Sequence, residues 1–264
     1  MPVEQGFTIE HPGDYRPAFA AAAEAGFGFV ELNMEARFSR DAVDPAAVRE
    51  AAGEHGLDLI VHLPYSVDAG SPHEHAREGA CRELEAGIDA AAAFGAEKAV
   101  VHAHASVRPA HWEHSRVVDA VRASVRRLGE YAAERRVTAC AENLKGQFVD
   151  VTDVPALLAE TDAAMCLDTS HAFVSGLDGG DQAAFLREHG DRIAHVHLND
   201  TRTRETDEHL PVGLGRVGFE PLAAAIVETG WSGTCTHEVF RFDGTFAYVR
   251  TGKRRFDAMF AGTG

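Results

Sequence analysis

The stretch IAHVHLNDTRTRETDEHLPVGLGRVGF, from Ile193 to Phe219, has the form of a strand, a polar loop and the start of a helix. The apolar residues up to Leu198 predict the strand, and the turn-prone pair Asn199-Asp200 ends it. Three glycines near the end of the loop let the backbone turn before Phe219 begins the helix. A strand joined to a helix in this way is the repeating unit of parallel α/β folds.

The same unit recurs along the chain. Short apolar runs predict eight strands, at Gly6–Glu10, Phe29–Met34, Asp58–His62, Lys98–His102, Thr138–Glu142, Ala164–Asp168, Ile193–Leu198 and Gly233–Glu238. Longer amphipathic runs predict eight helices, at Tyr15–Ala25, Pro45–His55, His73–Phe94, His114–Arg135, Val154–Glu160, Gln182–His189, Phe219–Thr229 and Phe246–Phe260. Eight such units in 264 residues, with no linker, predict one α/β domain over residues 1–264, folded as a single (β/α)8 TIM barrel rather than an open sheet.

The charge balance is strongly acidic. The chain carries 41 acidic and 25 basic residues, which gives a formal net charge of -16. This balance favours a heavily hydrated surface and argues against polyanionic partners, which are bound by basic patches. No apolar run reaches the roughly 18 to 20 residues of a membrane span, and Met1 to Gln5 lack the pattern of a signal peptide. We therefore expect a soluble cytoplasmic protein that makes no membrane contact.

The four cysteines are scattered and form no C-x-x-C pair. They are Cys81, Cys140, Cys166 and Cys235. The last three lie in apolar runs, which predicts small buried core residues. A disulfide framework or a cysteine–zinc site is therefore not expected.

Side chains that bind metals occur at or near the ends of six predicted strands. They are His62, His102, Glu142, Asp168, His197 and Glu238. In a barrel of this kind the carboxyl ends of all strands face one mouth, where active sites are built. Imidazole and carboxylate groups are typical ligands of divalent metals. The sequence therefore predicts a divalent-metal site at the mouth of the barrel.

Each of these residues also has a structural interpretation. A single histidine at a strand end is often structural, but His62 and His102 end adjacent strands, which favours metal ligands. His104 lies two residues further on and is expected beside the ligands or in solvent. A buried Glu142 requires a metal ion or a charged partner, because an unpaired buried charge is costly. The alternative to a metal ion is an ion pair with an arginine inside the barrel.

The loops add further ligand candidates. Asp168 and His171 lie three residues apart, so a helical turn would bring both to one cavity; alternatively Asp168 caps a helix and leaves His171 on the surface. Asp207 and His209 are two residues apart, and an extended backbone would point both the same way. The same alternation turns His237 away from the barrel interior.

These motifs resemble the endonuclease IV / xylose isomerase-like TIM-barrel superfamily from about Leu59 to Glu238. In endonuclease IV, a zinc enzyme that cuts DNA at abasic sites, motifs of this form supply nine ligands to three metal ions. The resemblance implies that Glu142 bridges metals and that the other ligands fall into three sets. These sets are His62 and His102; Asp168, His197 and Glu238; and His171, Asp207 and His209.

The chain also departs from the endonuclease IV pattern. The first strand reads GFTIEHPG instead of a G-A-H-x-S segment, and the fourth ends in HAHAS instead of H-P-G-S. The loop between His197 and Asp207 is shorter than the loop that grips DNA, although Tyr65 matches a substrate-contacting tyrosine. The segments DEHLPVGLGR and GTCTHEVF instead resemble the sugar isomerases and epimerases of the superfamily. Those members bind one divalent ion through residues matched here by Glu142, Asp168, His197 and Glu238.

Two enzyme functions follow from this pattern. The first, favoured by the acidic charge and the altered loops, is a sugar or sugar-phosphate isomerase or epimerase. It would work through an enediolate, with Glu142 and Glu238 as acid and base and with Lys145 and Arg216 holding a phosphate or carboxylate. The alternative for Lys145 is an exposed surface residue without a substrate contact. The alternative is an endonuclease IV-like zinc-cluster phosphodiesterase acting on abasic DNA, which would use all nine ligands. The paired glutamates disfavour a non-catalytic metal- or sugar-binding barrel.

The identity of the metal stays open at this point. The resemblance admits zinc, manganese, cobalt or magnesium, as one ion or as a cluster of three. Dimers and tetramers are common among the proteins that the chain resembles, so a homo-oligomer is also expected.

Overall fold

The fold is a closed barrel of eight parallel strands. The computed structural model describes residues 3–9, 14–240 and 245–261. The strands are β1 (Glu4–Ile9), β2 (Phe29–Asn33), β3 (Asp58–His62), β4 (Lys98–His102), β5 (Thr138–Glu142), β6 (Ala164–Asp168), β7 (Ile193–Leu198) and β8 (Thr234–His237). Each strand pairs with its neighbour in sequence, and β8 pairs with β1 to close the ring. The predicted (β/α)8 TIM barrel is therefore confirmed.

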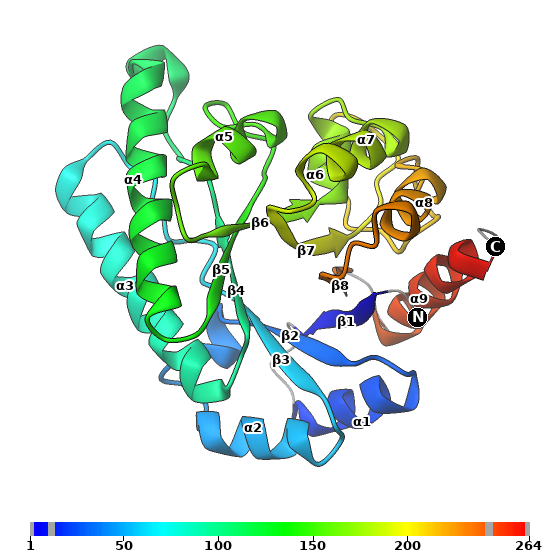
Figure 1. Ribbon diagram of the computed structural model, residues 1–264. Helices are drawn as coiled ribbons and strands as arrows, with labels where there is room; N and C mark the ends of the chain where they lie inside the picture. Colours follow the sequence, from blue (N-terminus) through cyan, green and yellow to red (C-terminus); the bar gives the residue numbers. More distant parts are fainter. Residues whose placement is uncertain (1–2, 10–13, 241–244, 262–264) are drawn as a thin grey trace.

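The helices surround the barrel on the outside (Figure 1). They are α1 (Arg16–Glu24), α2 (Pro45–Gly53), α3 (Glu74–Phe94), α4 (His114–Ala133), α5 (Val154–Leu158), α6 (Thr169–Val174), α7 (Gly179–His189), α8 (Glu220–Thr229) and α9 (Thr245–Ala261). Three short 3-10 helices, η1 (Ala36–Phe38), η2 (Pro109–His111) and η3 (Val151–Asp153), lie in loops. None of the helices in the described ranges is long and apolar enough to cross a membrane.

The structure differs from the predicted bounds, by one to three residues, at one or both ends of every predicted helix and of three predicted strands. The five strands from β3 to β7 have the predicted bounds, whereas β8 ends one residue before Glu238. Residue 10, predicted to end the first strand, lies outside the described residues. Helix α6 was not predicted, because it follows β6 directly. Asp168 ends the strand and also caps the helix, its Oδ1 accepting the N–H of His171 at 2.7 Å.

The main apolar core lies between the barrel and the helices, with large side chains such as Phe19, Phe94, Leu128 and Phe256 fully buried. A second, smaller apolar cluster is formed by Val100, Cys140 and Cys166. Successive residues of a strand alternate between its two faces. Each of these three strands has a predicted ligand two positions further along and therefore on the same face: His102, Glu142 and Asp168. These three side chains lie at the mouth of the barrel. Cys140, Cys166 and Cys235 are buried, as predicted, and Cys81 is buried as well.

Candidate metal centre

The mouth of the barrel brings the predicted ligands together in three overlapping groups. In each group the ligand atoms lie within 4.8 Å of one another. The groups are His62, His102 and Glu142; Glu142, Asp168, His197 and Glu238; and Asp168, His171 and His209. Glu142 and Asp168 each belong to two groups, so the three form one continuous cluster. The strand register supports this arrangement, because His102 is paired with Glu142 and Asp168 with His197.

The first group is built on the Glu142 carboxylate. Its Oε2 lies 3.1 Å from Nε2 of His62 and 3.3 Å from Nε2 of His102. Nδ1 of His62 lies 2.7 Å from the carbonyl oxygen of Leu63, which holds the hydrogen of that ring on Nδ1 and directs Nε2 at Glu142. Among the described residues the ion-pair partners of Glu142 are His62, His102 and His197, so the alternative of an arginine partner does not describe this group.

Protonation of the first group follows from these contacts. Burial opposes a charge on His62, but the hydrogen bond and the charge of Glu142 outweigh it and raise the pKa of His62 to about 9. His102 is different, because burial lowers its pKa to about 4. Burial also opposes ionisation of Glu142, yet the charge of His197 and the hydrogen bonds from the histidines hold its pKa well below the ordinary value. A divalent cation between these atoms would replace the proton on His62.

The central group places three carboxylates around one ring nitrogen. Nδ1 of His197 lies 3.0 Å from Oε1 of Glu142, 3.3 Å from Oε2 of Glu238 and 3.8 Å from Oδ2 of Asp168. All four residues are buried. Burial raises the pKa of Asp168 to about 7; His171 opposes the rise, and the charges of Glu238 and Asp207 add to it. So much buried negative charge requires protons or a cation, and the donor set of one imidazole and three carboxylates fits a divalent metal.

The third group comes from α6 and from the loop before α8. Oδ2 of Asp207 lies 2.8 Å from Nδ1 of His209 and 3.6 Å from Nε2 of His171, and Nε2 of His209 lies 3.2 Å from Oε2 of Glu238. Nδ1 of His171 is buried and has no hydrogen-bond partner among the described residues. A buried nitrogen with a free lone pair fits a metal ligand. Asp168 thus caps α6 and still faces the cluster, while His171 points to the cluster rather than to the surface.

The backbone of this loop differs from the prediction. We expected an extended segment through Asp207 and His209, but His209 has a left-handed φ of 47°. The chain reverses here because Leu210 returns to pair with Asp200, through two hydrogen bonds of 2.8 Å between their main-chain groups. The side chains of Asp207 and His209 meet through this reversal and not through strand alternation.

Three further residues support the cluster and were missed by sequence reasoning. Asn199 donates from Nδ2 to Asp168 (2.7 Å) and to Glu238 (2.9 Å). Glu31, fully buried on β2, faces Nε2 of both His197 (3.3 Å) and His195 (2.9 Å). The signal for them was strand alternation: His195 precedes His197 by two residues, and Glu31 is a charged residue within the apolar run of β2.

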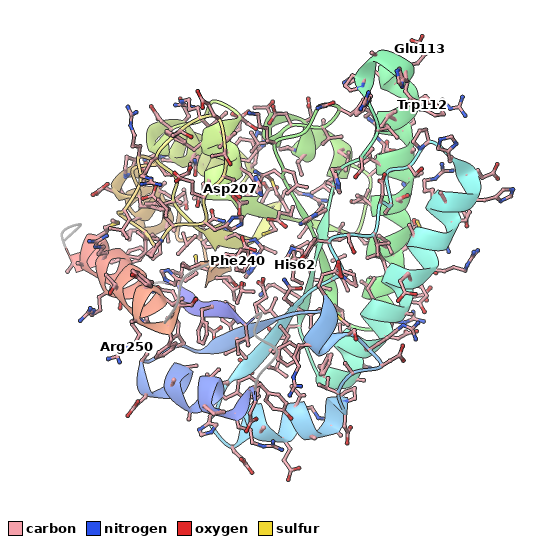
Figure 2. All side chains as sticks on the ribbon, turned by 180° about the vertical axis from the view of Figure 1, so that it is seen from behind. His62, Trp112, Glu113, Asp207, Phe240 and Arg250 are labelled. Atoms are coloured by element: carbon pink, nitrogen blue, oxygen red, sulfur yellow. The ribbon has the colours of Figure 1, made fainter. Side chains whose placement is uncertain are left out.

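A cavity of about 330 Å³ lies over the cluster. It is lined by Asn33, His62, Tyr65, His102, Glu142, His171, His209, Glu238 and Phe240. Figure 2 labels His62, Asp207 and Phe240 in this central region. The Tyr65 ring is stacked against that of His102, with centroids 6.2 Å apart, and the residue remains 45% exposed. His237 faces away from the cluster, as predicted, and contacts Phe27 and Phe256.

The two predicted anion-binding residues lie at the edge of this region. Lys145 is exposed and lines a separate hollow of about 290 Å³, together with His104 and Arg108, between the loops that follow β4 and β5. Arg216 is exposed on the loop before α8, where its main-chain N–H donates to the carbonyl of Thr201 at 2.8 Å. It does not belong to the residues that line the cavity over the cluster.

Comparison with known proteins places this geometry in a family. Endonuclease 4 of Thermus thermophilus is 28% identical over 81% of this chain and 83% of its own length. A probable endonuclease 4 of Halobacterium salinarum is 28% identical over 69% of this chain and 71% of its own length. Among solved structures, a D-tagatose 3-epimerase-like protein has a TM-score of 0.83 and 20% identity, with 98% of each chain covered. Endonuclease IV of Thermus thermophilus has a TM-score of 0.74 and 24% identity, over 98% of this chain and 99% of that one. Residues 19–258 match the sequence profile of the xylose isomerase-like TIM barrel family, and the chain therefore belongs to that family.

Proposed function

We propose that the chain is a divalent-metal-dependent phosphodiesterase that cuts DNA at abasic sites. The observation that carries the proposal is the convergence of all nine predicted ligands on one continuous cluster. The four-residue group of Glu142, Asp168, His197 and Glu238 would be enough for a single-ion sugar enzyme. A single-ion enzyme would not require the further contacts seen here. His62 and His102 contact Glu142, and His171 and Asp207 contact His209. The identity with proteins named endonuclease 4 supports the same choice.

The groups around the cavity have complementary tasks in this reaction. Bound divalent ions polarise phosphoryl oxygens, lower the pKa of water and neutralise a leaving oxygen. Glu142 and Glu238 would hold the ions, and both present carboxylate oxygens to the cavity, where they can take up a proton. Tyr65, half exposed above His102, offers a flat ring to a sugar or base at the rim.

The net charge of -16 is unfavourable for binding DNA, but positively charged side chains lie beside the mouth of the barrel. Lys145 and Arg108 line the hollow beside the mouth and place positive charge where a neighbouring phosphate would lie. Because few cations would contribute, we expect modest affinity for DNA and a shallow dependence of binding on salt concentration. Arg216 remains a candidate for a further contact on the opposite loop.

The test is incision of a duplex that contains one abasic site, with an intact duplex of the same sequence as substrate control. Metal ions per chain are counted by elemental analysis on the same preparation, purified without chelator. We expect close to three ions and cutting confined to the abasic duplex. The variant His209→Ala, which removes a member of the third group together with its contact to Glu238, should lose about one ion and most of the incision. A preparation that holds about three ions and leaves the abasic strand intact would refute the proposed reaction.

Sugar isomerisation or epimerisation is the second candidate, and one observation favours it. Glu142 and Glu238 line the same cavity, whose volume of about 330 Å³ suits a small ligand. They could remove and return a proton on either side of an enediolate. A panel of ketoses and ketose phosphates, assayed for changes at the carbon next to the carbonyl, separates the two candidates. Turnover of a sugar by a chain holding one ion, with His62→Ala leaving the ion count unchanged, would select this candidate.

A further inference from the structure

A buried polar layer lies inside the barrel beneath the metal cluster. Its centre is Glu31, whose Oε2 lies 2.9 Å from Nε2 of His195, 3.3 Å from Nε2 of His197 and 2.9 Å from Oγ1 of Thr236. Its other oxygen, Oε1, lies 3.3 Å from Oγ1 of Thr8. The donors come from β1, β7 and β8, so one carboxylate on β2 ties the strands on either side of the barrel closure.

His197 connects this layer to the cluster above it. Its ring nitrogens face opposite sides, with Nε2 towards Glu31 and Nδ1 towards Glu142 and Glu238. A neutral imidazole carries a hydrogen on one nitrogen and a lone pair on the other. Since an ionised carboxylate only accepts, the contact with Glu31 holds the hydrogen on Nε2. The lone pair of Nδ1 is then directed into the cluster.

We propose that Glu31 is a positioning residue of the metal centre, which accepts the Nε2–H of His197 and so makes Nδ1 of that ring the ligand atom. His195 holds the positioning carboxylate in turn. Its Nε2 donates to Glu31, and its Nδ1 accepts the hydroxyl of Thr234 at 2.6 Å. The inference rests on the metal centre of the proposed function but on neither reaction, so it applies to hydrolysis and epimerisation alike.

A purely structural role explains this layer less well. Burying an ionised carboxylate is costly, and apolar side chains of similar volume often fill such a position with equal or better stability. The other interior positions of this barrel include the apolar cluster of Val100, Cys140 and Cys166, so an apolar filling is available to this fold. A carboxylate aimed at the far nitrogen of a metal-ligand histidine is the arrangement that orients such ligands.

The first test measures binding of Zn²⁺ alone to the metal-free full chain, by competition with a chromophoric chelator. Glu31→Gln keeps the size of the side chain and replaces one oxygen by a donor. We expect the affinity for one ion to fall by about 10- to 100-fold, with the other ions retained. The matched control is Thr8→Val, which removes the contact to Oε1 and leaves the His197 contact in place; its Zn²⁺ affinity should equal that of the wild type. Unchanged affinity in Glu31→Gln, or an equal loss in Thr8→Val, would overturn the inference.

The melting temperature of the metal-free variants separates positioning from packing. A packing role lowers the melting temperature of metal-free Glu31→Gln and leaves its Zn²⁺ affinity intact. A positioning role lowers the affinity in a protein that still melts cooperatively.

A second measurement needs no variant of Glu31, so it stands even where Glu31→Gln fails to fold. The imidazole nitrogens of the Zn²⁺-loaded wild type are observed by nitrogen NMR, and His197 is assigned by comparison with His197→Gln. We expect a protonated Nε2 and a metal-bound Nδ1. A metal-bound Nε2 refutes the role of Glu31, and a chain that binds no Zn²⁺ refutes the metal centre itself. Failure to cut abasic DNA would refute the proposed function and would leave the proposed role of Glu31 unaffected.

Discussion

A Cβ atom on Gly215 would lie 2.3 Å from Oδ1 of Asp200. The main chain at Gly215 must lie close to the Asp200 carboxylate, because this carboxylate accepts hydrogen bonds from three main-chain N–H groups of the loop. They are those of Gly213 (3.0 Å), Gly215 (2.7 Å) and Val217 (3.1 Å). Asp200, two residues after the end of β7, therefore binds the main chain at the far end of the same loop. The loop carries Asp207 and His209 between these two anchors, so the third ligand group depends on the contact.

Gly215→Ala should open this loop. The added methyl group meets Asp200 and the carbonyl oxygen of Thr201, at 2.4 Å, and one of them has to move. We expect a destabilisation of about 1 to 3 kcal/mol and loss of the ion that the third group would hold, because this loop carries His209. Chemical denaturation and elemental analysis measure the two effects. Gly53→Ala at the end of α2 is the matched control, because its Cβ meets no atom within 4 Å. Wild-type metal content in Gly215→Ala would contradict the role of the Gly215–Asp200 contact in anchoring the loop.

Glu142→Gln should remove activity under either candidate reaction. Glu142 contacts His62, His102 and His197 and is shared by two ligand groups. An amide offers a weaker ligand and places a donor among the histidines, so we expect turnover to fall by at least about a hundredfold. The assay is run at saturating metal, with Glu205→Gln, an exposed carboxylate of the loop before α8, as control. Near-normal rates in Glu142→Gln would remove this residue from the mechanism.

The stability of the metal-free protein should depend on pH through His62, His197 and His209, whose pKa values are all raised in the folded state. The pKa of His62 is raised from 6.5 to about 9, so its stabilisation is complete below about pH 6.5 and is lost as the pH rises through 9. We expect the melting temperature to fall between pH 7.5 and 9.5, a window that lies above the pKa of about 7 for Asp168. Bound Zn²⁺ replaces the proton on His62, so the loaded protein should lack this slope. The same slope with and without Zn²⁺ would show that other groups cause it.

Tyr65 offers a test of substrate contact that leaves the fold intact. The residue is 45% exposed, so Tyr65→Ala should shift the melting temperature little. If a base or sugar stacks on its ring, KM for the abasic duplex should rise by about tenfold with kcat nearly unchanged. Tyr65→Phe keeps the ring and should retain most of the affinity. Equal KM values for the alanine variant and the wild type would place the substrate elsewhere.

The barrel was predictable because its strands are buried on both faces. Continuous apolar runs mark such strands, and polar residues that end them stand out, as His62 and Glu142 do. Helix α6 was hidden because Asp168 serves as strand end, helix cap and cluster member at once, so no loop separates the elements. The left-handed His209 could not be foreseen either, since its conformation depends on the pairing of Leu210 with Asp200, which the sequence does not reveal.

The supporting layer was harder to predict than the ligands. Glu31 occurs within an apolar run, where one charged residue is indistinguishable from a side chain that points to solvent. His195 was overshadowed by His197, although both lie on one face of β7. Only the closed ring, in which β1 and β8 alone separate β2 from β7, shows that Glu31 and these histidines share the barrel interior.

The sharing of Glu142 and Asp168 between groups has a thermodynamic consequence for loading. An ion bound by one group would withdraw charge from a carboxylate that the next group also uses, and it would fix that carboxylate in one orientation. The binding of successive ions would therefore be linked, and the linkage would be reciprocal: the factor by which the first ion changes the affinity for the second is the same in either order. Titration with Zn²⁺ should accordingly deviate from the curve of three independent sites, and Glu142→Gln should bring it closer to independence.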